Sequence, residues 1–261
     1  MQSLTGWTQT TPSPYELRTG CEVILLGAGV ASVGASLALD DNLTPLDAAT
    51  IPTLNRRAIN GFDRPATYQF SKTAGRLSTL VLAGTAVAAG AVGISPNARQ
   101  DWKTVGTMYV ETILLANGVE RSVEKLVTRN RPFVYYPNAP LSEKLTTDAR
   151  RSFFSSHATN AFASAVFAGE VFRHYYPNSR LKPVVWIGTL GLATATSVLR
   201  YEAGKHYPTD LMAGAAFGSL VGWGIPKLHE VKNRHSALKQ LDIQPWSTGQ
   251  ATGLYARWTL K

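Results

Sequence analysis

The sequence predicts an all-α protein, a six-helix membrane bundle with three active-site motifs on one face. Two observations support this fold class. Six long stretches are poor in charge and apolar on all sides, and the segments rich in reactive side chains fall in alternate connections between them. The apolar stretches are 22–39, 77–94, 105–119, 158–172, 183–199 and 211–225.

The stretches are slightly shorter than the ~20 residues that cross a bilayer comfortably. Glu111 and Glu170 interrupt two of them, so core helices of a soluble bundle are an alternative. Membrane helices are favoured because a core helix of a soluble protein usually keeps one polar face, which these stretches lack. Helices rich in Gly and Ala can also pack closely in lipid.

An even number of spans places both termini on one side of the membrane and the connections 40–76, 120–157 and 200–210 on the other. The segment 40–76 has too weak an apolar pattern to span, and we expect it to lie at the interface. The domain organisation follows: a polar N-terminal segment 1–20 without signal-peptide features, a helical domain 21–228, and a tail 229–261. Partial alternation near 252–260 predicts a short strand or a membrane-surface anchor.

Composition narrows the functional classes. The chain has 26 Lys and Arg against 17 Asp and Glu, a net charge of +9, but the basic residues are spread out, so nucleic-acid binding is not predicted. The lone Cys21 excludes an intramolecular disulfide and a multi-cysteine metal site. The glycines of segment 25–32 resemble a dinucleotide-binding turn, but the third glycine and a βαβ pattern are missing.

The segment 200–210 contains Arg200, His206 and Asp210. Pro208 predicts that a helix begins there, because proline suits the first helical turn. Asp210 would then reach back to His206, fix its tautomer and leave one ring nitrogen as a nucleophile. A capping aspartate beside a surface histidine is the alternative.

The segment 152–157 ends in Ser155, Ser156 and His157, directly before an apolar helix. A helix N-terminus offers free backbone N–H groups to an anion. We expect His157 to donate a proton beside a bound phosphate, although Ser155 or Ser156 could simply cap the helix.

The segment 121–132 is basic, with Arg121, Lys125 and Arg129 at four-residue spacing and Arg131 before Pro132. Alone, such a cluster usually binds solvent or lipid headgroups. Together with the other two segments it supplies the cations that phosphoryl transfer requires.

In this order the three segments resemble the signature of the type 2 phosphatidic acid phosphatase and vanadium haloperoxidase superfamily: Lys-x6-Arg-Pro, Pro-Ser-Gly-His and Ser-Arg-x5-His-x3-Asp. Three positions of this signature depart. Glu124 stands at the lysine position, with Lys125 one residue late; Phe154 and Ser156 replace proline and glycine; Leu199 replaces serine. One residue turns a helical side chain by about 100°, so Arg121 or Arg129 could replace Lys125.

The resemblance implies a metal-independent lipid phosphatase of the bacterial inner membrane, without cofactors, whose site faces the extracytoplasmic side. Its substrate would be a lipid phosphate or an isoprenoid diphosphate, its other partners membrane lipids. The oligomeric state is not predicted. The implied roles are His206 as nucleophile, Asp210 as its partner, His157 as general acid, and Lys125, Arg131, Ser155, Ser156 and Arg200 as phosphate ligands.

Three alternatives remain open. A vanadate-dependent haloperoxidase would share this site. A non-catalytic membrane protein could bind lipid phosphate with the same residues. His157, His206 and Asp210 could instead hold a divalent metal ion, but the surrounding Arg and Lys side chains favour an anion.

Overall fold

The computed structural model describes residues 13–39, 43–231, 241–247 and 252–258 of the 261-residue chain. The chain divides into two compact units, Met1–His229 and Glu230–Lys261. In the second unit, strands β1 (Leu241–Ser247) and β2 (Thr252–Trp258) pair antiparallel. The strand predicted near 252–260 is therefore present, and the helical fold belongs to the first unit.

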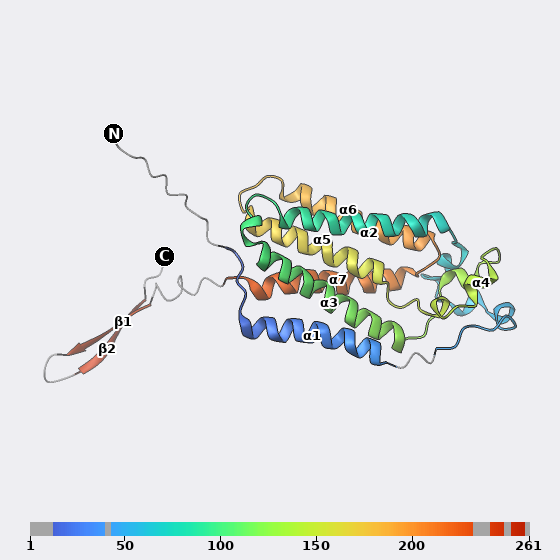
Figure 1. Cartoon of the computed structure of the whole chain (residues 1–261), viewed down its shortest axis with the longest axis horizontal. Coiled ribbons are helices and arrows are strands. Elements are labelled where there is room, and N and C mark those ends of the chain that lie inside the picture. Colours follow the sequence, from blue (N-terminus) through green and yellow to red (C-terminus); the bar gives the residue numbers. More distant parts are fainter. Residues whose placement is uncertain (1–12, 40–42, 232–240, 248–251, 259–261) are drawn as a thin grey trace. The chain divides into compact units, whose positions relative to one another are not determined.

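All six predicted helices are present, two to ten residues longer than their apolar stretches (Figure 1). They are 20 to 25 residues long, because the helices continue beyond one or both ends of the apolar stretches, and this length matches a bilayer. A single-turn helix, α4 (Leu141–Lys144), lies between the third and fourth. The long helices are α1 (Thr19–Ala38), α2 (Lys72–Gly93), α3 (Trp102–Leu126), α5 (Ser156–Tyr175), α6 (Lys182–Glu202) and α7 (Pro208–His229).

Helix α5 forms the centre of the bundle and packs against α2, α3, α6 and α7, while α1 packs against α3. Thirteen of its 20 residues are buried, most of them small. Three glycines of α7 at four-residue spacing face its backbone: a Cβ at Gly218 would lie 2.1 Å from the Thr159 carbonyl oxygen. The absence of side chains there lets the two helices approach closely.

Helices α1, α2 and α6 are long and apolar enough to cross a membrane, and most of their residues lie on the bundle surface. Ile24, Leu80 and Ile187 are among their exposed apolar side chains. A water-facing bundle would expose polar residues there. The buried carboxyl groups Glu111, Glu120 and Glu170 lie on α3 and α5. The chain is a membrane protein, and α1, α2 and α6 expose apolar side chains on the bundle surface.

The three motif segments lie at one end of the bundle, as predicted (Figure 1). The loop after α1 adds three short 3₁₀ turns, Ile51–Thr53, Arg56–Ala58 and Arg64–Tyr68. Its apolar side chains pack against a small core around Phe133 and Val134, which follow the first motif. This loop therefore becomes part of the structure that supports the motifs.

Candidate active site

Backbone hydrogen bonds join the three motif segments. The first pairs with the second: Arg131 N–H donates to the Ala149 carbonyl at 2.8 Å, and Ser152 N–H to the Arg129 carbonyl at 3.0 Å. The first meets the third where Phe133 N–H donates to the Gly204 carbonyl at 2.8 Å. Gly204 has φ +67°, and a Cβ there would lie 2.1 Å from the Gln69 carbonyl oxygen, so the turn requires glycine. The segments form one structural unit.

His206 is buried beneath two arginines. Its Nδ1 lies 2.8 Å from the Ser152 carbonyl oxygen, so Nδ1–H donates and Nε2 keeps its lone pair. Nε2 lies 3.3 Å from Nη1 of Arg131 and 3.2 Å from Nη2 of Arg200. Burial, with these two guanidinium groups, holds the pKa of His206 well below its usual value. The ring is neutral, and its unprotonated Nε2 accepts from both guanidinium groups, the cations that an anion would bind.

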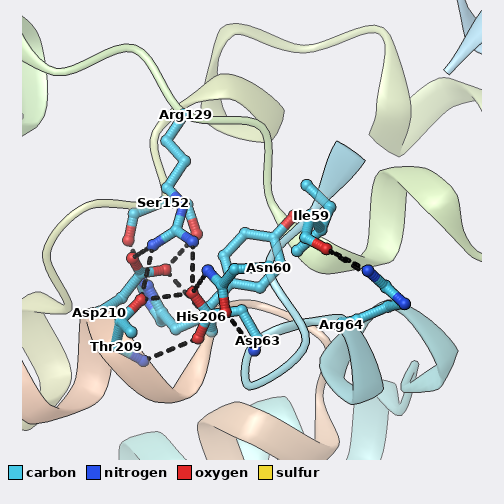
Figure 2. Close-up of polar contacts among 10 residues, drawn as sticks. Ile59, Asn60, Asp63, Arg64, Arg129, Ser152, His206, Thr209 and Asp210 are labelled. Carbon is cyan, nitrogen blue, oxygen red and sulfur yellow. Dashed lines mark hydrogen bonds and ion pairs between the residues drawn. The ribbon is translucent and has the colours of Figure 1, made fainter. Parts of the chain in front are cut away.

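Asp210 does not bond to His206, although the sequence predicted that it would. Its Oδ2 accepts from the Ser152 hydroxyl at 2.6 Å and from Tyr207 N–H at 2.9 Å, and its Oδ1 accepts from Arg129. Ser152 thus lies between the two: its hydroxyl binds Asp210, and its carbonyl binds His206. Asp210 is therefore linked to His206 only through Ser152. Figure 2 shows this arrangement.

A second buried carboxylate, Asp63, binds Arg129 and Thr209, the side chain that contacts Asp210 and the residue next to it (Figure 2). It accepts from Thr209 N–H at 3.0 Å, from the Thr209 hydroxyl at 2.7 Å and from Arg129 at 2.7 Å. Burial alone would raise the pKa of Asp63, but hydrogen bonds from Thr209, Asn60 and Arg129 outweigh it and lower that pKa. Arg129 therefore joins two carboxylates, and its guanidinium group lies over the Tyr207 ring.

Sequence reasoning assigned no role to Asp63, Ser152 or Thr209. Asp63 precedes the first motif by more than sixty residues. Ser152 belongs to the second motif segment, but its part depends on its backbone carbonyl, which every residue has. These roles depend on the contacts of Asp210 with Arg129 and Ser152, which the sequence does not indicate.

A cavity of about 390 Å³ is lined by Arg131 and Arg200, the two arginines that contact His206, which itself lies behind them and is buried. His157 lies on its wall, with its Nε2 3.2 Å from the Thr79 hydroxyl. Arg131 and Arg200 reach both His206 and this cavity, and Nε of Arg200 is buried without a hydrogen-bond partner, so it is available to an anion. The lining residues are Leu82, Asn117, Glu120, Arg121, Glu124, Arg131, Asp148, Ser156, His157, Asn160 and Arg200.

Two predicted phosphate ligands lie elsewhere. Nζ of Lys125 donates to the Leu39 carbonyl at 3.2 Å, because the one-residue shift turns it away from the cavity. The Ser155 hydroxyl accepts from Ala158 N–H at 3.3 Å and caps α5. Ser156 lies on the cavity wall. Of the two substitutes considered for Lys125, Arg121 lines the cavity, whereas Arg129 binds Asp63 and Asp210.

A second cavity of about 290 Å³ shares Arg200 with the first. Lys72, Arg76 and Lys205 line it, and Glu143 forms an ion pair with Lys72 at 2.9 Å. Burial and the charge of Arg131 lower the pKa of Lys205. Cationic groups therefore continue from the first cavity into the second.

The arrangement suits an oxyanion better than a metal ion. The Nε2 lone pair of His206 faces two cations, and the oxygens of Asp210 are taken by Ser152, Tyr207 and Arg129. His157, His206 and Asp210 thus do not direct their ligand atoms to one point. A nucleophilic nitrogen, fixed cations and a second imidazole are the parts that phosphoryl transfer through a covalent intermediate needs.

The model of the PAP2 superfamily matches residues 106–234. Decaprenylphosphoryl-5-phosphoribose phosphatase of Mycobacterium tuberculosis is 28% identical over 133 residues, 51% of this chain and 63% of that protein. Lipid A 4'-phosphatase of Bacteroides thetaiotaomicron is 34% identical over 132 residues, 47% of this chain and 54% of that protein. The chain thus matches less than two thirds of the length of these relatives.

A crystal structure of a transmembrane PAP2 type phosphatidylglycerolphosphate phosphatase from Bacillus subtilis has the same fold. It superposes with a TM-score of 0.50 at 16% identity, over 81% of this chain and 99% of that one.

Proposed function

Because the model of the PAP2 superfamily matches residues 106–234, we propose that the chain is a member of that superfamily and a lipid phosphatase, a phosphoric ester or anhydride hydrolase. In this proposal the reaction passes through a phosphohistidine and uses no metal ion. The observation that carries the proposal is Nε2 of His206, which bears no proton and accepts from two guanidinium groups that a phosphate would bind in its place.

In the first half-reaction, Nε2 of His206 attacks phosphorus. The N–P bond forms while the bond from phosphorus to the lipid oxygen breaks, and His157 gives its proton to the leaving oxygen. A bound phosphate dianion favours the protonated form of His157, because opposite charges attract in a poorly hydrated cavity.

In the second half-reaction, water attacks the phosphohistidine. His157, now neutral, takes the proton of that water, the N–P bond breaks, and inorganic phosphate leaves with His206 restored. One imidazole thus serves as acid and then as base, so the cycle needs no further proton carrier.

The cations neutralise the phosphate oxygens throughout. Arg131 and Arg200 contact both His206 and the cavity, Arg121 lines its rim, and the N-terminus of α5 adds free backbone N–H groups. Glu124, with Oε1 3.9 Å from Arg131, offsets part of this positive charge and helps to hold that guanidinium in place.

A lipid substrate is supported by the apolar helices around the site and by the relatives, which are named as phosphatases of a decaprenyl phosphate sugar and of lipid A. The second cationic cavity, lined by Lys72, Arg76 and Lys205, suits the distal phosphate of an isoprenoid diphosphate. The same side chains would accept a lipid phosphomonoester. We propose that the site faces the extracytoplasmic side of a bacterial inner membrane.

The test is phosphate release by the purified chain from a panel of lipid phosphates and isoprenoid diphosphates, with chelator present during a brief assay. Labelled substrate should leave an acid-labile, base-stable phosphoryl group on the wild type and none on His206→Ala. No release from any substrate, with retained binding, would favour the non-catalytic lipid-phosphate-binding protein. Halide oxidation with vanadate would favour the haloperoxidase.

Membrane orientation needs its own test. A cysteine placed at exposed Asn138, in a variant without Cys21, should react with an impermeant maleimide in intact spheroplasts. Labelling only after the membrane is broken would contradict the proposed orientation.

A further inference from the structure

We propose that Glu22, Glu111 and His229 bind a divalent transition-metal ion, with Zn²⁺ the best fit, at the end of the bundle away from the phosphate cavity. The three residues come from α1, α3 and α7. This site lies outside the family signature and takes no part in the hydrolysis proposed above.

The site is separated from His206 by the length of α7. That helix begins at Pro208, beside His206, and ends at His229 (Figure 1), a distance of about 30 Å along its axis. Glu22 lies in the first turn of α1, and Glu111 lies inside α3, where its side chain has no exposed surface. The metal would tie the start of α1, the middle of α3 and the end of α7 together.

The orientation of His229 is fixed by its own helix. Nδ1 lies 2.8 Å from the Ile225 carbonyl oxygen and donates to it, which directs Nε2 at the two carboxylates. Without metal, a proton on Nε2 makes the hydrogen bond to Glu22, and a metal ion would take the place of that proton. That nitrogen lies 3.1 Å from Oε1 of Glu22 and 3.3 Å from Oε2 of Glu111. A backbone carbonyl behind a ligand histidine is the usual support in metal sites.

The spacing of these atoms matches a tetrahedral ion. Zn–N and Zn–O bonds of about 2.0–2.1 Å at tetrahedral angles place neighbouring ligand atoms about 3.3 Å apart. All three ligand atoms lie within 4.8 Å of one another. Little movement is needed to close them around an ion.

Unpartnered oxygens are the second observation that points to a cation. Neither carboxylate oxygen of Glu111 has a hydrogen-bond partner, although the side chain is fully buried, and Oε2 of Glu22 also lacks one. Glu170, another buried carboxylate, instead holds Arg173 at 2.5 Å. Buried charges are normally paired or bound to metal, and here one imidazole nitrogen is shared by two carboxylates that keep three oxygens without a hydrogen bond.

The donor set selects the class of ion. An imidazole nitrogen favours zinc and its neighbours among the transition metals, whereas Mg²⁺ and Ca²⁺ favour oxygen ligands alone. The fourth ligand of the ion would be a second oxygen of Glu22 or Glu111, which have oxygens without hydrogen bonds, or a water molecule. We therefore expect Zn²⁺ to bind and Mg²⁺ to compete poorly.

The test is metal content and thermal unfolding of the full chain in detergent. Wild type, dialysed against Zn²⁺ and then against buffer, should keep about one Zn²⁺ per chain, and added Zn²⁺ should raise its Tm. Glu111→Gln and His229→Gln should each lose at least tenfold in Zn²⁺ affinity and lose the Tm response. Glu170→Gln, which removes a buried carboxylate outside the cluster, should bind as wild type does.

If Glu111→Gln does not fold, Glu22→Gln replaces it, since Glu22 is the less buried ligand. Absence of bound Zn²⁺ in wild type overturns the proposal, and so does equal binding by Glu111→Gln or His229→Gln. A higher Tm for Glu111→Gln without metal would show that the carboxylates share a proton instead. These readouts do not depend on turnover, so they stand or fall separately from the phosphatase proposal.

Discussion

His206 and His229 lie at opposite ends of α7 and share one hydrogen-bonding pattern. Each donates Nδ1–H to a backbone carbonyl at 2.8 Å, that of Ser152 or of Ile225, and thereby directs Nε2 away from that carbonyl toward charged side chains. Their surroundings have opposite charge. Nε2 of His206 meets two guanidinium groups, whereas Nε2 of His229 meets two carboxylates.

In both histidines the Nδ1–H hydrogen bond fixes the orientation of Nε2. The charges of the side chains around Nε2 then determine which ligand it can bind. Between arginines, the lone pair meets an electrophilic phosphorus whose oxygens the cations hold. Between carboxylates, it can meet only a proton or a metal ion. Histidine alone thus indicates neither function, and the charges around Nε2 distinguish them.

The largest expected effect concerns the nucleophile. His206→Ala should lower turnover by at least about 10³-fold, because the covalent route is lost. The same variant should still bind one Zn²⁺, since the two clusters share no residue. His174→Gln, a histidine substitution on α5, is the control for general damage. Turnover close to wild type in His206→Ala would remove the nucleophile assignment.

Asp210→Asn should have the next largest effect. The change weakens the hold on Ser152, whose carbonyl orients His206, and misplacement of a nucleophile by about 1 Å costs about 10²-fold in rate. Because Asp210 positions the ring and does not touch substrate, kcat should fall while KM stays nearly constant. Asp210→Glu should recover part of the rate. An equal rise of KM would indicate direct contact with substrate.

Arg121 and Lys125 offer a smaller, paired test. Arg121→Ala should lower kcat/KM about tenfold, the lower end for a charge-assisted hydrogen bond, because Arg121 lines the cavity. Lys125→Ala should leave kcat/KM unchanged, because Nζ of Lys125 donates to Leu39. The opposite ranking would mean that the helix end rearranges when substrate binds.

The sequence predicted the helices well, and also the position of the three motif segments at one end of the bundle, because both depend on local pattern. Six apolar stretches define six helices, and an even number of spans brings the motif segments together. It predicted Lys125 and Ser155 less well, because a one-residue shift and a helix cap decide where those side chains point. Both outcomes follow from helix geometry, and only coordinates show which alternative applies.

The contacts that the sequence did not predict are tertiary. Asp63 meets Asp210 through Arg129 and Thr209, and Glu22 meets His229 across more than two hundred residues. Asp63, Glu22 and His229 stand in no recognisable motif. Buried pairs of this kind depend on how helices and loops dock, and a single sequence carries no signal for that distance.

The pH dependence should show the effect of the arginines on His206. Because its pKa lies well below the usual value, the nucleophile stays neutral as pH falls through 6.5. The decrease of kcat/KM on the acid side of the pH profile, its acid limb, should therefore begin only at lower pH. Arg200→Gln removes one nearby cation and should move that limb to higher pH. The measurement is a pH profile of both proteins. An acid limb unchanged by Arg200→Gln would show that Arg200 does not contribute to the lowered pKa of His206.

The smallest expected effect tests whether the two ends are independent. Vanadate, which mimics the transferred phosphoryl group, should raise Tm by binding beside Arg131 and Arg200. Zn²⁺ should raise Tm by binding to Glu22, Glu111 and His229. Each ligand at 100 times its Kd contributes about 2.7 kcal/mol. Distant sites without shared residues add to within about 0.5 kcal/mol, so the two Tm increments should sum. His206→Ala should lose mainly the vanadate increment and Glu111→Gln only the zinc increment. A combined increment well below the sum would show that α7 couples its two histidines.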